Sequence, residues 1–154
     1  MSAFLSILSM LAGTVGIFFG FYYLGEQPEL ALKLVTLSTV GIVGVLAFIR
    51  HFLFYKSDMK RLGWETDRPD WMFEVGFANL GFGAMGLVAT LTNLGKAAMT
   101  VSLAGYALYL FQASMLHGYR YFTDAEKSAA RLWRSCLATL LYAGMMGYFV
   151  LATL

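Results

Sequence analysis

The chain has little of what a soluble enzyme uses. Its single cysteine, Cys136, excludes an internal disulfide and a cluster of thiolate metal ligands. Charged residues make up only 13% of the 154 residues, roughly half the share of a typical soluble domain. The net charge of +2 is too small to indicate binding to nucleic acid. We find no phosphate-binding loop, nucleophile elbow or HExxH motif, so the sequence leaves open whether the protein is an enzyme.

What the sequence does contain is a set of long apolar runs with little charge. Each run is close to the 20 residues that an α-helix needs to cross the hydrocarbon core of a bilayer. The five predicted spans are residues 3–24, 31–55, 72–94, 97–118 and 131–153. We therefore predict an all-α integral membrane protein, a five-helix transmembrane bundle that forms one domain over residues 1–154.

The basic residues indicate how the bundle is oriented. With five spans, one side of the membrane holds Arg50, Lys56, Lys60, Arg61, Arg68, Arg120, Lys127, Arg131 and Arg134. The other side holds Lys33 and Lys96. Loops rich in lysine and arginine stay in the cytoplasm, so this count predicts a cytoplasmic N-terminus and a C-terminus on the opposite side. A bacterial cytoplasmic (inner) membrane is the expected location.

Small residues predict where the helices pack. Gly16 and Gly20 form a GxxxG pair on the first span, a pattern that lets another helix approach closely. A longer stripe follows one face of the third span and consists of Gly76, Asn79, Gly83, Gly86, Thr90 and Asn93. Such stripes are the usual contacts between membrane helices, so we favour a packing surface. The alternative is a hydrated path or a groove for a ligand.

Polar and ionisable residues near the bilayer are the candidate functional site, because their burial is costly. They lie toward the cytoplasmic ends of the second, third and fourth spans: Arg50, His51, Glu74, Asn79, Gln112, His117 and Arg120. His51 and His117 could bind a haem iron from two sides. Together with Glu74 they could instead form a site of two histidines and one carboxylate for a metal ion. Histidines near a membrane surface also serve simply as anchors.

Two further interpretations concern this same region. Glu74 could carry a proton or pair with a nearby cation, but it lies in the first turn of its helix, where a carboxylate complements the helix dipole. Its helix face differs from that of Asn79. The basic and aromatic rim could bind anionic lipid headgroups or a quinone-like head, although the same residues already satisfy the positive-inside rule.

One segment resembles a known group of proteins. Residues 73–83, Phe-Glu-Val-Gly-Phe-Ala-Asn-Leu-Gly-Phe-Gly, look like the signature "EVGFANLxFG" of a family of small, functionally uncharacterised bacterial multi-span membrane proteins. The resemblance implies a histidine near the end of the following span, which matches His117. It also implies an acidic residue one turn earlier, whereas this chain has Gln112-Ala113-Ser114-Met115. The resemblance brings no activity with it.

These features lead to one main functional hypothesis and two alternatives. The main hypothesis is a structural or accessory membrane protein that acts as a homo-oligomer or as a subunit of a larger membrane complex. The first alternative is a protein that handles a cofactor, a metal ion or protons at the polar site. The second is a small channel or exporter lined by the Asn79–Asn93 stripe. The expected partners are the lipid bilayer and other membrane subunits, including copies of the chain, and not nucleic acid.

Overall fold

The computed structural model describes residues 1–64, 66–123 and 132–154, and these parts of the chain are helical without any strand. The elements are α1 (Ser2–Tyr23), α2 (Pro28–Val35), η1 (Thr36–Ile42), α3 (Val43–Phe48), η2 (Ile49–Leu53), α4 (Tyr55–Leu62), α5 (Asp70–Leu91), α6 (Gly95–Thr123), η3 (Leu132–Leu137) and α8 (Ala138–Ala152). Five continuous helical segments within them are long and apolar enough to cross a membrane: Ser2–Tyr23, Pro28–Leu53, Asp70–Leu91, Gly95–Thr123 and Leu132–Ala152. The predicted five-helix membrane bundle is therefore confirmed. Residue 131, the predicted start of the last span, lies outside the described residues.

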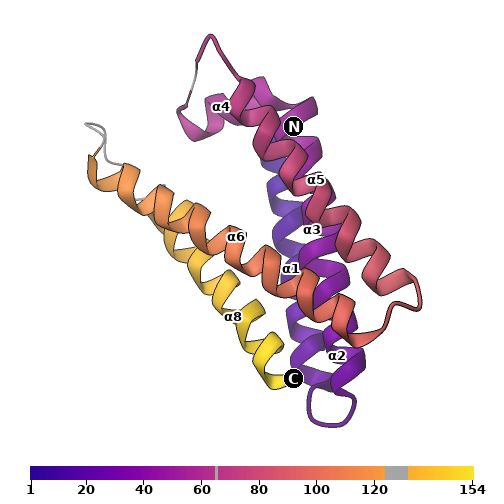
Figure 1. Cartoon of the computed structure of the whole chain (residues 1–154). Coiled ribbons are helices and arrows are strands. Elements are labelled where there is room, and N and C mark those ends of the chain that lie inside the picture. The colour runs from indigo at the N-terminus through magenta and orange to yellow at the C-terminus, as the bar shows by residue number, and fades with distance from the viewer. Residues whose placement is uncertain (65, 124–131) are drawn as a thin grey trace.

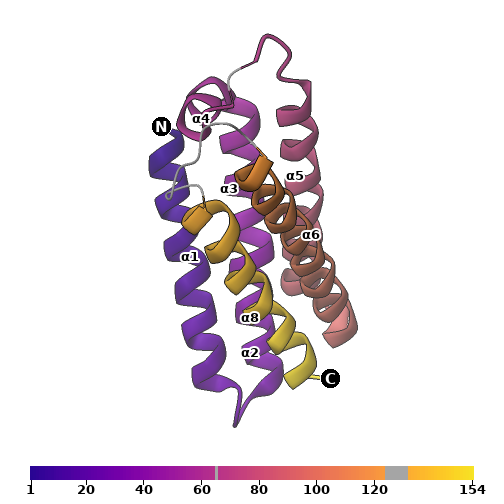
Figure 2. The ribbon, with the colours of Figure 1, turned by 90° about the vertical axis from the view of Figure 1, so that its left-hand side faces the viewer.

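The two chain ends lie at opposite ends of the bundle (Figures 1 and 2). Helix α4, the start of α5 and the end of α6 lie at the end where the N-terminus is found, and the α1–α2 connection lies at the other. Helices α6 and α8 run together, and in Figure 1 α6 crosses the bundle at a steep angle to α1. The assignment of the N-terminal end to the cytoplasm rests on the charge count and stays a prediction.

The second membrane span is not a regular α-helix. It runs from Pro28, with Gln27 as its N-cap, through two wider π-helical stretches, η1 and η2. At the end of η2 the amide of Phe54 donates to the carbonyl of Ile49 at 3.2 Å, a bond that spans five residues. Phe54 itself leaves the helical conformation, with φ −113° and ψ 29°. The chain therefore changes direction here, and α4 continues as a separate short helix at the end of the bundle (Figure 1).

Helix α4 ends at Gly63, whose φ of 69° is the left-handed conformation that glycine adopts without a steric cost. The amide of Trp64 donates to the carbonyl of Met59 at 3.0 Å, and that of Gly63 donates to Lys60 at 3.3 Å. These two bonds form a Schellman motif, which stops a helix and reverses the chain. The motif therefore sets the direction in which the chain leaves α4 at Trp64 and continues toward α5.

The glycine face of α5 packs directly on the second span. A Cβ atom added at Gly83 would lie 2.9 Å from the backbone nitrogen of Val45, and one at Gly86 would lie 2.7 Å from that of Gly41. Backbones this close leave space only for hydrogen at those positions. The Asn79–Thr90 part of the stripe is therefore filled by the neighbouring helix, and Asn93 lies beyond the end of α5 and is exposed.

The glycines of α1 also face neighbours within the same chain. An added Cβ at Gly16 would meet the side chain of Ser38, and one at Gly20 would meet Val35. The central core lies between α1, α2, η1, α6 and α8, and its fully buried members are Leu32, Val35, Val40, Leu103, Met146 and Phe149. The GxxxG pair thus forms an internal contact of the bundle.

Candidate functional site: a buried charge cluster beside α4

The centre of the site is Asp58 of α4, whose side chain has no exposed surface. Arg61, one turn later, donates to Asp58 Oδ1 from Nε at 3.0 Å and from Nη2 at 2.8 Å. On the other side, His51 Nδ1 lies 2.9 Å and Arg50 Nε 3.5 Å from Asp58 Oδ2. One carboxylate therefore holds two guanidinium groups and an imidazole, and these come from α4 and from η2.

The contacts of His51 indicate a neutral ring and its tautomer. Arg50 Nη2 lies 3.0 Å from His51 Nε2. A guanidinium group can only donate a hydrogen bond, so Nε2 must be the acceptor and carries no proton. The proton of a neutral His51 then sits on Nδ1, which faces Asp58. This Nδ1 contact and that of Arg50 Nε are close in distance but lack the alignment of full hydrogen bonds.

The electrostatics of the cluster favour an ionised Asp58. Burial disfavours the charged carboxylate, but the close approach of His51 and the positive charges of Arg50 and Arg61 outweigh it. The net effect holds the pKa of Asp58 below its ordinary value. Asp58 is therefore a fixed negative charge at neutral pH. It is not poised to exchange a proton there.

The irregular backbone of the second span creates this cluster. Arg50 and His51 both lie on the π-helical turn η2, which ends at the break at Phe54. Because α4 then leaves in a new direction, Asp58 comes back over the end of η2. Wide turns of this kind often occur at functional sites, since they aim side chains that a regular helix would direct elsewhere.

Two contacts tie α4 to other parts of the bundle. The hydroxyl groups of Ser57 and of the buried Ser2 are hydrogen-bonded at 3.0 Å, which joins α4 to the start of α1. After the α4 cap, the ring of Trp64 stacks on His117 of α6 with 5.0 Å between ring centroids and 21° between planes. Trp64 also meets Trp71 of α5 edge to face, at 5.4 Å. Helix α4 and its cap thus bridge three membrane helices.

A second polar network lies deeper in the bundle and connects α5 with α6. The hydroxyl of Tyr106, which is 1% exposed, donates to Asn79 Oδ1 at 2.7 Å. Asn79 Nδ2 in turn donates to the Val75 carbonyl at 2.7 Å and to the Tyr109 hydroxyl at 3.2 Å. The asparagine has partners on both of its polar atoms, so this network fixes the register of two helices.

The structure brings together only some of the residues that the sequence singled out. Arg50 and His51 are in contact. His117 instead stacks on Trp64, directly after the α4 cap. Glu74, Gln112 and Arg120 are exposed, Glu74 on a face of α5 away from Asn79. Arg120 has an interaction of its own.

The geometry does not assemble the metal site expected from His51, His117 and Glu74. Among the described residues, no group of three histidine, cysteine, aspartate or glutamate side chains is close enough to hold a metal ion. Both nitrogens of His51 face other protein groups, Arg50 and Asp58. A haem iron could bind His51 only after one of these contacts was broken.

Sequence reasoning missed Asp58, Arg61, Trp64 and the two tyrosines that bind Asn79. Asp58 follows His51 by seven residues and precedes Arg61 by three. Those spacings place charges of opposite sign on one helix face, which was the available signal. Tyr106 and Tyr109 stand three residues apart in an apolar run and looked like ordinary core residues.

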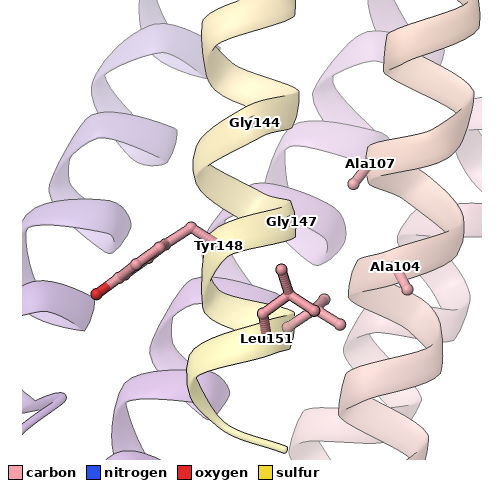
Figure 3. Close-up of a pocket in the computed structure, with 7 residues that line it drawn as sticks. Ala104, Ala107, Gly144, Gly147, Tyr148 and Leu151 are labelled. Carbon is pink, nitrogen blue, oxygen red and sulfur yellow. The ribbon is translucent and has the colours of Figure 1, made fainter.

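A different feature lies on the outer surface between α6 and α8. An open groove of about 560 Å³ is lined by Ala104, Ala107, Gly144, Gly147, Tyr148, Val150 and Leu151. Figure 3 shows Ala107 of α6 pointing toward α8, with Ala104 on the same helix and Gly147 and Leu151 on α8. A Cβ atom added at Gly144 or Gly147 would have no neighbour within 4 Å. These two glycines therefore differ from Gly83 and Gly86, whose space is taken by another helix of the same chain.

Comparisons with known proteins agree with this picture at the level of the family. No curated protein and no solved structure shows a significant match to the chain. One family model, described as "Family of unknown function (DUF6790)", matches residues 1–153. This agrees with the expected resemblance to an uncharacterised family, while the bacterial origin and the signature segment stay predictions. Since the match covers nearly the whole chain, the protein belongs to this family of unknown function.

Proposed function

We propose that the protein is a structural or accessory component of a bacterial cytoplasmic membrane, which acts as a homo-oligomer or as a subunit of a larger membrane complex. The groove between α6 and α8 carries this proposal. Gly144 is exposed and Gly147 and Ala104 are half-buried there, at neighbouring positions of two helices, whereas Ala107 is buried. Small residues on a membrane helix allow the backbone of a second helix to come close, which is the main source of association within lipid.

The charge cluster supports the same role. Asp58 Oδ1 accepts two hydrogen bonds from Arg61, Oδ2 lies at ion-pair distance from His51 and Arg50, and His51 is held between Arg50 and Asp58. A catalytic group needs a free side for its substrate, whereas these groups mainly satisfy one another. Their common effect is to hold α4 against the end of the second span, and so to keep the end of the bundle in one shape.

The test is to fill the groove. Leucine at Gly144 or at Gly147 has open space within this chain, so the bundle itself should keep its thermal stability. Native mass spectrometry and cross-linking in mild detergent would then report the assembly. We expect the wild type to assemble with itself or with a co-purifying membrane subunit, and Gly147→Leu to weaken that assembly.

Gly81 supplies a matched control, because an added Cβ there also meets nothing within 4 Å but lies on α5, away from the groove. Gly81→Leu should leave the assembly intact. A wild-type protein that is a solitary monomer at all concentrations would overturn the proposal. Equal assembly of the Gly147 and Gly81 variants would show that the groove is not the contact.

A second candidate function is proton handling at the polar site. The observation that favours it is His51, a titratable group held beside buried Asp58 near the end of a membrane span. Proton flux into liposomes containing the wild type, lost in His51→Gln, would support it. A haem would give a Soret band and a bound metal would appear in elemental analysis, so one clean preparation also tests the cofactor alternatives. Absence of flux, absorbance and metal would remove this candidate.

A further inference from the structure

We propose that Arg50 and Arg61 form a binding site for a phosphate-bearing anion, such as the headgroup of an anionic lipid in the leaflet next to α4. The site would use the guanidinium donors that Asp58 does not occupy. It goes beyond the assembly role above and does not depend on it.

The cluster has a net positive charge within the described residues. Arg50 and Arg61 each carry one positive charge, Asp58 carries one negative charge, and His51 is neutral because its Nε2 accepts from Arg50. Within the described residues, Asp58 is the only carboxylate at ion-pair distance from either arginine. Counted over the described residues, the cluster thus carries one positive charge without an ion-pair partner. An anion bound beside it would remove the cost of holding that charge in a largely buried place.

The two arginines have guanidinium donors that Asp58 does not use. Arg61 uses Nε and Nη2 on the same oxygen of Asp58, which leaves Nη1 for another acceptor. Arg50 Nε is buried beside Asp58 Oδ2 at 3.5 Å and Arg50 Nη2 contacts His51, which leaves Nη1 as the Arg50 donor for an anion. The two side chains are 18% and 22% exposed, so an incoming group can reach them. Arginine pairs with phosphate through two parallel hydrogen bonds, and an acceptor with several oxygens fits these remaining donors.

The site lies near one end of a membrane span. Arg50 lies four positions before the break at Phe54, near the end of the second span, and Arg61 lies on the helix that follows. The ends of membrane spans lie next to the headgroup region, which contains the lipid phosphates. Trp64, directly after the α4 cap, is a residue type that favours the same zone. Basic pockets at such a boundary are known to recognise lipid headgroups.

The experiment compares lipids of opposite headgroup charge on the full chain. Protein in mild detergent receives dioleoylphosphatidylglycerol, dioleoylphosphatidylcholine or inorganic phosphate, and native mass spectrometry counts the bound molecules. We expect phosphatidylglycerol to be retained over phosphatidylcholine. Arg61→Gln, which brings the cluster to zero net charge, should weaken this retention about tenfold, as expected for one lost charged hydrogen bond. Lys60→Gln removes the same charge from an exposed neighbour and should change little.

Two further arms complete the test. Arg61→Gln with Asp58→Asn restores the net charge of +1, so this double variant should regain part of the retention. Competition by inorganic phosphate would identify a free phosphate as an alternative source of the anion. Equal binding of the two lipids by the wild type, without phosphate binding, would overturn the proposal. So would retention that falls equally in the Arg61 and Lys60 variants.

Discussion

Replacement of Asp58 by asparagine removes the charge at the centre of the cluster with almost no change in shape. The variant leaves Arg50 and Arg61 in place and takes away the only carboxylate that they share within the described chain. An amide offers one oxygen as acceptor where the carboxylate offers two. The four contacts that three side chains make with Oδ1 and Oδ2 are therefore weakened at once, and the two positive charges repel each other.

The size of the effect follows from the burial of the partners. Loss of one member of a fully buried ion pair destabilises a protein by about 3–5 kcal/mol, because the other charge is left without compensation. Asp58 is fully buried, but Arg50 and Arg61 are 18% and 22% exposed, so water can solvate them in part. We therefore expect a loss of about 2–3 kcal/mol in the free energy that docks α4.

Two assays separate local from global effects. Unfolding by sodium dodecyl sulfate in mixed micelles, followed by circular dichroism, reports the whole bundle, and hydrogen exchange of the amides in residues 55–62 reports α4. We expect faster exchange in α4 and a smaller change in the bundle, since α4 lies at its end. Asp67→Asn, at an exposed position, is the control. If Asp58→Asn exchanges and unfolds like this control, the cluster does not hold α4.

Three other predictions concern pH and packing. The pKa of Asp58 is lowered in the folded protein. The stability from its ion pairs is therefore present above the ordinary carboxyl pKa of about 3.9 and is lost as the pH falls through the folded pKa. The difference in melting temperature between wild type and Asp58→Asn should accordingly shrink below about pH 4. Gly83→Ala should cost about 1–3 kcal/mol in detergent unfolding, because its Cβ would meet the backbone of α3, whereas Gly81→Ala should be nearly neutral. Asn79→Leu should cost about 1–2 kcal/mol, since it leaves the Tyr106 hydroxyl without its acceptor, and an unchanged melt would show that this bond is weak.

The arrangement of spans could be predicted because the bilayer imposes a simple requirement on sequence. A segment that crosses it needs about 20 apolar residues and must satisfy its own backbone, and only a helix does so within one segment. Residues 75–95 meet this requirement without a single charge, and α5 covers Asp70–Leu91. The second span begins at Pro28, three residues before the predicted start at residue 31, because the fixed φ of proline suits the first helical position.

The charge cluster could not be predicted because it depends on a departure from regular helix. In an unbroken helix His51 and Asp58 would be two turns, roughly 10 Å, apart along the axis. The wide turn of η2 and the break at Phe54 replace that rise with a change of direction, which brings His51 Nδ1 to 2.9 Å from Asp58. The segment contains no proline or glycine that would indicate the break. The KSDMKR stretch has the polar composition that is typical of a solvated surface, yet its aspartate is fully buried.

Asn79 shows an intermediate case. Its place among glycines on one face of a span indicated a packing surface, and α5 does meet the second span along that face. Its hydrogen-bond partners, however, are Tyr106 and Tyr109, 27 and 30 residues later. Their positions depend on the crossing angle of α6 over α5, which side-chain packing determines and which the local sequence does not encode.

The groove and the charge cluster occupy different parts of the molecule, and this separation makes the two proposals independent. Gly147 and Leu151 of the groove lie on α8 toward the C-terminal end of the bundle, whereas α4 lies at the N-terminal end (Figure 1). Effects of substitutions without shared contacts usually add. A variant that combines Gly147→Leu with Arg61→Gln should therefore lose assembly and lipid selectivity to the same extent as the single variants. A coupled loss would mean that the phosphate site is completed only in the assembled protein.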